Sequence, residues 1–304
     1  MGDKIRSILK RNQYIVGTYD KSKVIRYKYL ISDKKFIKKK FKSRLNREVE
    51  LDNPVKFNDK LQWLKLKWND PLATKCADKY EVREFISEKI GSEYLNELYG
   101  VYESVDDIDI KKLPDRFVFK GTHGSGFNTI CNNKYEMNWE NEFQKMKRWL
   151  KTNYFWQNRE WVYKDIKPRI ICEKYLEEVE TGELRDYKIF CFDGEPKIIE
   201  VDFARFKNHK RNFYDLNWKQ IKGEIKYQKD ESVKIQRPQK LNEMLMLSKK
   251  LSQGFPHVRV DFYYINDKVI FGELTFFHES GMGMFRPEEF EIQMGNWLEL
   301  PILK

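Results

Sequence analysis

The sequence predicts an α+β fold built largely on antiparallel sheets. Three pairs of segments rich in β-branched and aromatic residues are each joined by a short turn or loop: FVFK and NTIC, DYKIFCF and KIIEVDF, VRVDFYY and KVIFGELTFF. Strands joined so closely are antiparallel. Around these pairs, apolar residues recur at helical spacing. Hairpins combined with helices thus predict the fold class.

Helical spacing is the second kind of pattern in the chain. Residues 57–100 are expected to be helical, because apolar side chains recur there at intervals of three and four. The same spacing predicts helices over 143–150 and 241–251, and a final helix is expected to begin at Pro287. RIICEKYL, by contrast, has the continuous apolar character of a strand.

The composition indicates a globular protein with an anionic partner. The chain has 304 residues, of which 40% are hydrophobic and 15% aromatic, so it can bury a large core in one composite domain or in two. Its 58 Lys and Arg residues outnumber 47 Asp and Glu residues, for a formal charge of +11. Nucleic acid, an acidic membrane surface and a polyanionic glycan all suit that charge.

Cysteine usage and hydropathy predict a cytoplasmic protein. The four cysteines are well separated, without a CxxC pair, which favours reduced thiols over zinc ligands or disulfides. The segment MGDKIRSILKR lacks the apolar core of a secretory signal, and the sequence has no run of 18 apolar residues.

Residues 1–50 are distinguished by their positive charge. KKFIKKKFKSRLNR carries eight basic residues, and Phe36, Ile37, Phe41 and Leu45 recur within it at near-helical spacing. This pattern predicts a basic amphipathic helix. Its apolar side chains either dock on the body of the protein or contact anionic lipid or a lipid-linked glycan, as a peripheral membrane segment would.

The loop GTHGSG at residues 121–126 has the features of a phosphate-binding loop. Glycines let backbone amides approach a phosphate without obstruction by a Cβ atom, and Lys120 at the loop entrance supplies a positive charge. The loop is not a Walker motif, because GK[ST] is absent. His123 could bond a phosphate oxygen. A plain hairpin turn is the alternative.

Two acids are expected to meet across the last hairpin. Counting outward from its turn, Asp261 and Glu273 lie roughly opposite each other on one face of the sheet. Two neighbouring carboxylates repel unless a cation lies between them, and oxygen ligands of this kind suit Mg²⁺ together with substrate phosphates. A salt bridge to Arg259 or Lys188 is the alternative.

Three further segments are candidates for ligand contacts. The exit of the RIICEKYLEE strand can bind an adenine edge, or it is an ordinary buried strand. The basic, aromatic segment DFARFKNHKRNFYD suits an acceptor, or it is a solvated loop. Its composition could also suit nucleic acid, but no nucleic-acid-binding motif accompanies it, so nucleic acid is not expected. The loop HESGMGMFR follows the second acidic strand and contains Arg286.

These segments, in this order and spacing, resemble the ATP-grasp superfamily, and most closely its TupA-like branch, named after teichuronopeptide biosynthesis. The resemblance covers about residues 55–300 and includes CADKYEVREFI, where Lys79 resembles the first of two ATP-phosphate lysines. Lys120 resembles the second, and EKYLE is similar to the adenine-side segment of biotin carboxylases. Thr275 stands where many ATP-grasp enzymes have Asn, and its hydroxyl can still ligate Mg²⁺.

The resemblance implies two α+β subdomains that clasp ATP between antiparallel sheets, with a basic helical extension at the N-terminus. The corresponding ranges are a basic segment 1–50, a helical part 51–115, a small ATP-binding subdomain 116–180 and a large subdomain with the metal site 181–304. The residues implied for ATP are Lys79, Lys120, His123, Gly124, Ser125, Gly126, Glu173, Tyr175, Leu176 and Lys188. The roles assigned to other residues are Mg²⁺ binding for Asp261, Glu273 and Thr275, and catalysis for Lys120, Arg259 and His278. The acceptor candidates, taken from the basic segment and the loop described above, are Arg205, His209, Arg211 and Arg286.

The same resemblance implies an ADP-forming carbon–nitrogen ligase that uses ATP and Mg²⁺. Such enzymes activate a carboxylate as an acyl phosphate, which an amine then attacks. Because the branch is associated with cell-surface polysaccharides, the expected partners are an anionic glycan or lipid-linked saccharide whose uronic acid is amidated or joined to an amino acid, and an amino acid or amine. A kinase with Asp186, Asp202 or His278 as its base, a glycosyltransferase and a non-catalytic ATP-binding scaffold are the alternatives.

Overall fold

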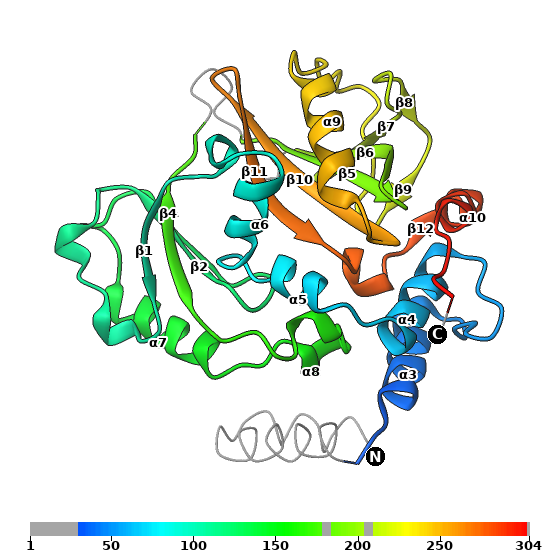
Figure 1. Ribbon diagram of the computed structural model, residues 1–304, viewed down its shortest axis with the longest axis horizontal. Helices are drawn as coiled ribbons and strands as arrows, with labels where there is room; N and C mark the ends of the chain where they lie inside the picture. Colours follow the sequence, from blue (N-terminus) through cyan, green and yellow to red (C-terminus); the bar gives the residue numbers. More distant parts are fainter. Residues whose placement is uncertain (1–29, 178–183, 204–208, 303–304) are drawn as a thin grey trace.

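Two antiparallel sheets of different size form the framework of the molecule (Figure 1). The computed structural model describes residues 30–177, 184–203 and 209–302. A small sheet has the strand order β1-β4-β2-β3, and a large sheet has the order β11-β10-β5-β6-β7-β8. Neighbouring strands in both sheets are antiparallel, so the predicted α+β class is confirmed.

The small sheet has a hydrophobic core of its own. Its strands are β1 (Leu98–Tyr102), β2 (Phe117–Gly121), β3 (Asn128–Cys131) and β4 (Ile170–Lys174). Every second residue of β2 is buried, and Phe117 and Phe119 pack against Trp139 of helix α7 (Trp139–Leu150). Asn138 caps α7, since its side chain accepts a hydrogen bond from the Asn141 amide.

Strand β1 replaces the end of the region predicted to be helical. Helices α4 (Phe57–Lys67), α5 (Pro71–Ala77) and α6 (Val82–Lys89) occupy much of residues 57–100. The chain leaves α6 at Gly91, whose φ of +115° is unfavourable for other residues. After the turn η1 (Ser92–Tyr94), the chain pairs with β4. The helical prediction is wrong for residues 98–100, because pairing with β4 and packing on the small core decide this segment.

The large sheet supports the main hydrophobic core. Its strands are β5 (Asp186–Phe192), β6 (Glu195–Phe203), β7 (Lys210–Tyr214), β8 (Gln220–Ile221), β10 (His257–Ile265) and β11 (Lys268–Thr275). Helix α9 (Leu241–Ser252) covers one face, and Cys191 of β5 lies against its Ser248 carbonyl. Every residue of β5 is buried, including the charged Asp186 and Lys188.

Tight turns fix the pairing of the large sheet. Asp193-Gly194 and Asn266-Asp267 all have positive φ values, as two-residue hairpin turns require, so both predicted hairpins are confirmed. Register shifts between Asp261 and Phe262: Phe262 pairs with Phe271 but Asp261 pairs with Glu273. Gly272 is therefore the extra residue of a β-bulge.

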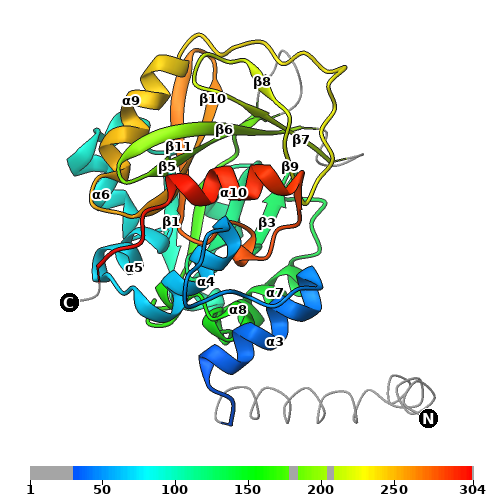
Figure 2. The ribbon, with the colours of Figure 1, turned by 90° about the vertical axis from the view of Figure 1, so that its right-hand side faces the viewer.

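Helix α3 (Asp33–Leu45) packs on the body of the protein. Ser32 caps it, and Phe36, Ile37 and Phe41 are buried. Just beyond the helix, Arg47 forms ion pairs with Asp59 and with Glu291 of helix α10 (Glu288–Trp297). Figure 2 shows α3 beneath α4 and beside helix α8 (Phe155–Asn158). Of the two expectations for this segment, docking on the body therefore holds for α3. Residues 1–29 of the predicted segment lie outside the described residues.

Short elements connect these parts. They are the turns η2 (Val105–Asp107), η3 (Ile110–Lys112), η4 (Trp161–Tyr163) and η5 (His278–Gly281), and the paired strands β9 (Glu224–Ile225) and β12 (Phe285–Arg286). Among the described residues, none of the helices has the length and apolar character needed to span a membrane.

Candidate active site

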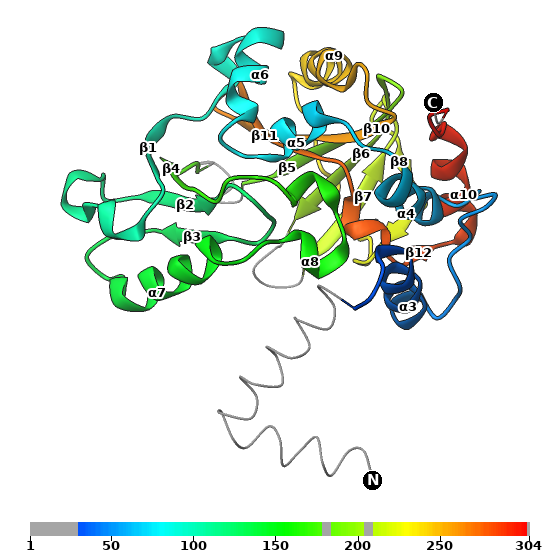
Figure 3. The same ribbon diagram turned by 60° about the horizontal axis from the view of Figure 1, so that its bottom comes forward.

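A polar cavity of about 620 Å³ lies where the two sheets face each other. Strands β10 and β11 supply Asp261, Glu273 and Thr275, and the glycine loop between β2 and β3 supplies Ser125 and Gly126. The cavity extends past η5 to helices α8 and α3, which lie along one side of the body in Figure 3. It thus joins the segments that the sequence predicts for phosphate, metal and acceptor.

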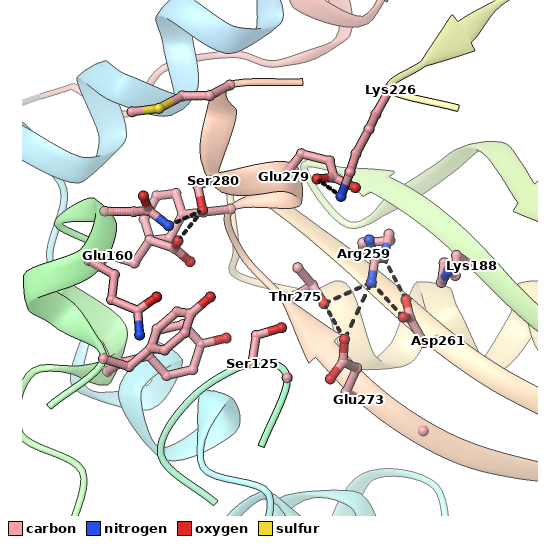
Figure 4. A pocket seen from close by; sticks show the side chains of 18 of the residues that line it. Ser125, Glu160, Lys188, Lys226, Arg259, Asp261, Glu273, Thr275, Glu279 and Ser280 are labelled. Atoms are coloured by element: carbon pink, nitrogen blue, oxygen red, sulfur yellow. Dashed lines mark hydrogen bonds and ion pairs between the residues drawn. The ribbon is translucent and has the colours of Figure 1, made fainter. Parts of the chain in front are cut away.

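The two predicted metal carboxylates face each other and share a guanidinium (Figure 4). Arg259 donates from Nε and Nη2 to the two oxygens of Asp261, over 2.7 and 2.6 Å. The same Nη2 lies 3.3 Å from Glu273 Oε1 and 3.1 Å from Thr275 Oγ1. The Thr275 hydroxyl also donates to Glu273, over 3.0 Å. Both the paired acids and the alternative salt bridge to Arg259 are therefore present.

The donor set fits Mg²⁺ bound with a nucleotide. It consists of two carboxylates and a hydroxyl, and Glu273 keeps 37% of its side chain exposed toward the cavity. Within the described residues, no cluster of three or more His, Cys, Asp and Glu side chains could hold a metal by itself. Two carboxylates suffice for Mg²⁺ when substrate phosphates and water complete its coordination. Asp261, Glu273 and Thr275 are the residues that would hold it.

Burial and nearby charges give the two acids different pKa values. Burial raises the pKa of Asp261 to about 7, although the Arg259 guanidinium opposes the shift. Burial also acts to raise the pKa of Glu273, but the positive charges of Lys79 and Arg259 prevail and lower it to about 2. Glu273 is therefore the more strongly ionised of the pair before any metal binds.

The two predicted phosphate lysines line the cavity from different parts of the fold. Lys79, between α5 and α6, donates to the Gly124 carbonyl over 2.9 Å and lies 3.6 Å from Glu273 Oε2. Lys120, at the end of β2, forms an ion pair of 2.8 Å with Glu173 of β4. Their ammonium groups are within reach of a polyphosphate bound beneath the glycine loop.

The glycine loop presents only part of itself to the cavity. Ser125 and Gly126 are exposed and line it, and Gly126 has φ of +77° with open space around it. His123 is buried, and its Nε2 lies 2.8 Å from the Trp149 carbonyl. Burial lowers the pKa of His123, so the ring is neutral and Nε2 donates to that carbonyl. His123 is not among the residues that line the cavity.

The predicted adenine-side residues lie near the exit of β4. Glu173 is buried beside a small pocket that Val82, Leu95, Ile171 and Phe271 also line. Lys79, Arg83 and Lys120 line the same pocket, whose volume is only about 10 Å³, so it does not hold a purine ring as it stands. Tyr175 follows the strand and lies against the guanidinium of Arg116, 4.3 Å from its ring centroid. Leu176 follows directly in the chain.

A buried charge network lies on β5, β6 and β7 beside the acids. Lys188 pairs with Asp186, Glu200 and Asp202, and Arg211 pairs with Glu200 at 3.0 Å and Asp202 at 2.7 Å. Burial would raise the pKa of Asp202, yet Lys188 and Arg211 hold it far below its usual range. An aspartate held so firmly ionised is a poor general base.

His278 acts on this network rather than on the cavity. It is buried, its Nδ1 lies 2.6 Å from Arg259 Nη1, and its Nε2 lies 3.6 Å from Glu200. Burial, with the nearby charges of Arg259 and Arg211, lowers the pKa of His278 well below 6.5. The ring is neutral, and Nδ1 accepts a hydrogen bond from Arg259. His278 therefore orients Arg259, and through it the two acids.

The structure brings only part of the predicted acceptor set to the cavity. Arg211 lines it but is buried in β7 and tied to two carboxylates, so residues 210–214 form a buried strand instead of a solvated loop. His209 stacks on Tyr227, with ring centroids 3.8 Å apart. Arg286 is exposed on β12 and does not line the cavity. Arg205 lies outside the described residues.

Several cavity residues escaped the sequence interpretation. Helix α3 contributes Lys40 and Arg44, helix α8 and its surroundings contribute Gln157, Asn158 and Glu160, and β9 is followed by Lys226. The basic run of α3 was a signal for anion binding, but nothing in the sequence relates it to the acids over 200 residues away. The α8 segment carries no recognisable motif.

The loop after β11 is strained and held in place by buried polar groups. Glu279 and Ser280 have φ values of +46° and +57°, which non-glycine residues rarely adopt. Ser280 Oγ donates to Glu160 over 2.5 Å, and Lys65 donates to the Ser280 carbonyl over 2.7 Å. Glu279 is thereby directed toward Lys226, which it meets at 2.8 Å (Figure 4). Such strain is typical of functional loops.

Comparison with solved structures gives distant likenesses. A D-alanine–D-alanine ligase from Bacillus anthracis is 14% identical, with a TM-score of 0.36, over 71% of this chain and 58% of that one. Its Helicobacter pylori counterpart is 12% identical, with a TM-score of 0.42, over 80% and 69%. The ATP-grasp ligase PsnB with its minimal precursor is 10% identical, with a TM-score of 0.40, over 79% and 67%. At such values these likenesses carry no argument of their own.

The comparison with protein families is decisive. No protein of curated function matches the chain significantly. The family described as TupA-like ATP-grasp, however, matches residues 59–299, which is most of the chain and includes both sheets. Within that range lie the two lysines, the glycine loop and the facing acids described above. The chain therefore belongs to the TupA-like ATP-grasp family.

Proposed function

We propose that the protein is an ATP- and Mg²⁺-dependent ligase that joins an amine to a carboxylate of an anionic cell-surface glycan. The observation that carries the proposal is the continuity of one cavity. At one end are the lysines, glycine loop and facing acids that suit a nucleotide, and at the other is a polar, cationic space open to solvent. A glycan carboxylate entering there meets the γ-phosphate end of the nucleotide.

The charge of the cavity supports an acidic substrate. Among the described residues that line it, eight are cationic (Lys40, Arg44, Lys79, Lys120, Lys188, Arg211, Lys226, Arg259), against five carboxylates (Glu160, Asp186, Asp261, Glu273, Glu279). This excess of positive charge attracts anions in general, and the phosphates of ATP would neutralise only part of it. Amide and hydroxyl groups beside these charges, from Asn128, Gln157 and Ser280, suit sugar hydroxyls.

The chemistry requires positioning more than covalent catalysis. Bound Mg²⁺ would neutralise phosphate charge and orient the transferred group. Lys79 and Lys120 bind phosphate oxygens, and the exposed loop at Ser125 and Gly126 covers them. Arg259 keeps a positive charge beside the acids, where charge develops as the substrate carboxylate attacks phosphorus. The amine then attacks the carbonyl carbon of the resulting acyl phosphate, so that inorganic phosphate leaves, the nitrogen loses a proton and the amide forms.

A trapping experiment tests the reaction class without knowledge of the natural amine. The protein is incubated with ATP, Mg²⁺ and oligogalacturonate in the presence of hydroxylamine, which converts an acyl phosphate to a hydroxamate and free phosphate. We expect ADP, phosphate and hydroxamate in equal amounts, and no hydroxamate with a neutral oligosaccharide of equal length. ADP with phosphate retained on the glycan would instead indicate a kinase. In a parallel assay to which a nucleotide sugar is added, release of UDP or CMP would indicate a glycosyltransferase.

The proposed setting of the reaction is the cytoplasm, at the inner face of the membrane, where lipid-linked saccharides would be accessible. The support is the exposed basic surface of α3, which suits transient attraction to anionic headgroups. Because the apolar side chains of α3 are buried against the body, insertion of this helix into lipid is not part of the proposal.

A further inference from the structure

Helix α3 lies outside the matched family region, yet two of its basic side chains reach the active-site cavity. The family match begins at residue 59, whereas α3 ends at Leu45. Lys40 and Arg44, one helical turn apart, line the cavity, and Lys40 lies there beside Gln157 of α8. An element that precedes the shared catalytic unit thus contributes to the wall of its active site.

Helix α3 is firmly placed relative to α8. Its Asp33 forms an ion pair of 2.8 Å with the buried Arg159, which ends α8 and lies over the Phe36 ring, 4.5 Å from the centroid. Lys40 Nζ donates to the Gln157 carbonyl over 2.5 Å. These contacts hold the helix on the cavity side through both polar and apolar packing, so the backbone of α3 places Lys40 and Arg44 at the rim.

Arg44 is the cation best suited to an external ligand. Lys226 pairs with Glu279, and Arg211 with Glu200 and Asp202. In the described ranges 30–177, 184–203 and 209–302, by contrast, no hydrogen bond or ion pair engages the Arg44 guanidinium, which is exposed. A guanidinium binds a carboxylate through two parallel hydrogen bonds.

The groups beside this cation indicate a saccharide rather than a simple ion. Gln157 and Asn158 line the same end of the cavity, with Ser280, whose hydroxyl accepts from Asn158 Nδ2 over 2.8 Å. Neutral amides and hydroxyls suit the hydroxyl groups of a sugar, while an isolated carboxylate or phosphate needs only charge. The whole cavity, about 620 Å³, exceeds what a nucleotide's phosphates require.

We infer that Lys40 and Arg44 of α3 form the acceptor subsite, where they bind a carboxylate of an acidic glycan next to the one that reacts. The inference rests on the proposed function and deepens it, because it assigns substrate selection to an N-terminal helix that the family region lacks. It also replaces the exposed Arg286 of the sequence interpretation with residues that line the cavity.

Charge reversal with a matched control tests this assignment. The test variant is Lys40→Glu with Arg44→Glu, and the control is Lys35→Glu with Lys39→Glu, which has the same spacing and charge change at exposed positions outside the cavity. Binding of oligogalacturonate is measured by calorimetry in the presence of Mg²⁺ and a non-hydrolysable ATP analogue. We expect the test variant to raise the Kd for oligogalacturonate at least tenfold and the control to change it less than twofold.

Two further measurements distinguish failure of the α3 subsite from failure of the proposed ligase activity. The Kd for the ATP analogue should stay within twofold in both variants, which shows that the fold and nucleotide site persist. Equal losses of oligogalacturonate binding in the two variants, or no loss in either, would overturn the α3 subsite while hydroxamate formation by the unaltered protein still upheld the ligase. Conversely, oligogalacturonate that binds through α3 but never yields hydroxamate would refute the ligase and leave the subsite standing. Failure of the unaltered protein to bind oligogalacturonate would overturn the subsite as stated.

Discussion

Among single residues, Asp261 and Glu273 face each other but differ in exposure, 7% and 37% of their side chains respectively. Asp261→Asn leaves the buried Arg259 guanidinium without the carboxylate that accepts its two hydrogen bonds, so we expect a loss of about 3–5 kcal/mol in the free energy of unfolding. Glu273→Gln leaves those two hydrogen bonds intact. We expect Glu273→Gln to raise the free energy of activation by several kcal/mol, with a much smaller loss in the free energy of unfolding.

Urea unfolding and ADP formation separate these two effects. Glu195→Gln, an exposed acid at the β5–β6 turn that pairs with Lys249, is the control and should change neither quantity appreciably. A Glu273→Gln protein that turned over ATP normally with its carboxylate substrate would contradict the metal assignment.

The sequence could predict residues whose role is set by nearby chain, but not those set by distant contacts. The hairpin turn makes it predictable that Asp261 and Glu273 lie near each other on adjacent strands, but their direct pairing also depends on the bulge at Gly272. His123 was assigned to phosphate, yet it bonds the carbonyl of Trp149 on α7. Arg211 was assigned to the acceptor, yet it is buried by acids of β6. Both contacts depend on the packing of one helix or strand against another, which cannot be predicted from the sequence around either residue.

At the scale of elements, the turn η5 combines backbone strain with close packing. Gly281 has φ of +58°, and a Cβ atom there would lie 2.4 Å from Gln62 Nε2 and 2.9 Å from Leu61 Cβ. We expect Gly281→Ala to lower the free energy of unfolding through crowding, by about 1–3 kcal/mol, in addition to about 1 kcal/mol of backbone strain. Gln62 would lose its bond to the Gly281 carbonyl.

Gly254→Ala is the matched control for this prediction. Gly254 also has positive φ, +85°, but no atom lies within 4 Å of the added Cβ. It should therefore show the strain alone. Urea denaturation of both variants measures the difference, and equal losses would mean that the packing of η5 on α4 contributes nothing.

Element prediction from the sequence succeeded where the signals were local. The hairpins around residues 193–194 and 266–267, and the glycine loop between β2 and β3, follow from turn residues and strand composition. Strand β1 was missed because its pairing partner, β4, lies about 70 residues away. Helix α3 was predicted as a helix, but its docking beside α8 depends on Arg159, which has no distinctive sequence context.

For the molecule as a whole, the buried cysteines predict its behaviour in alkali. Burial raises the pKa of Cys76, Cys172 and Cys191 from 9.0 to about 12. An unfolded chain releases these protons at lower pH than the folded one. The free energy of unfolding is therefore undiminished by these thiols below about pH 9 and falls as the pH rises from 9 toward 12.

Circular dichroism against pH measures this loss of stability, and thiol labelling identifies its cause. In the folded protein at pH 8 all four cysteines are buried and should resist alkylation, then react after unfolding in urea. Cys191→Ala should flatten the alkaline decline relative to the unaltered protein. Rapid alkylation of Cys191 under native conditions would contradict the prediction.

The β-bulge at Gly272 means that the site depends on a residue count as well as on residue identity. Side chains alternate between the faces of a strand, so in a regular hairpin closed by Asn266-Asp267 the partner of Asp261 would be Gly272, and Glu273 would point to the other face. One inserted residue reverses that parity and brings both acids to the cavity. A variant or relative that keeps both acids but loses one residue between them would therefore keep the sequence pattern, yet its two carboxylates would point to opposite faces of the sheet.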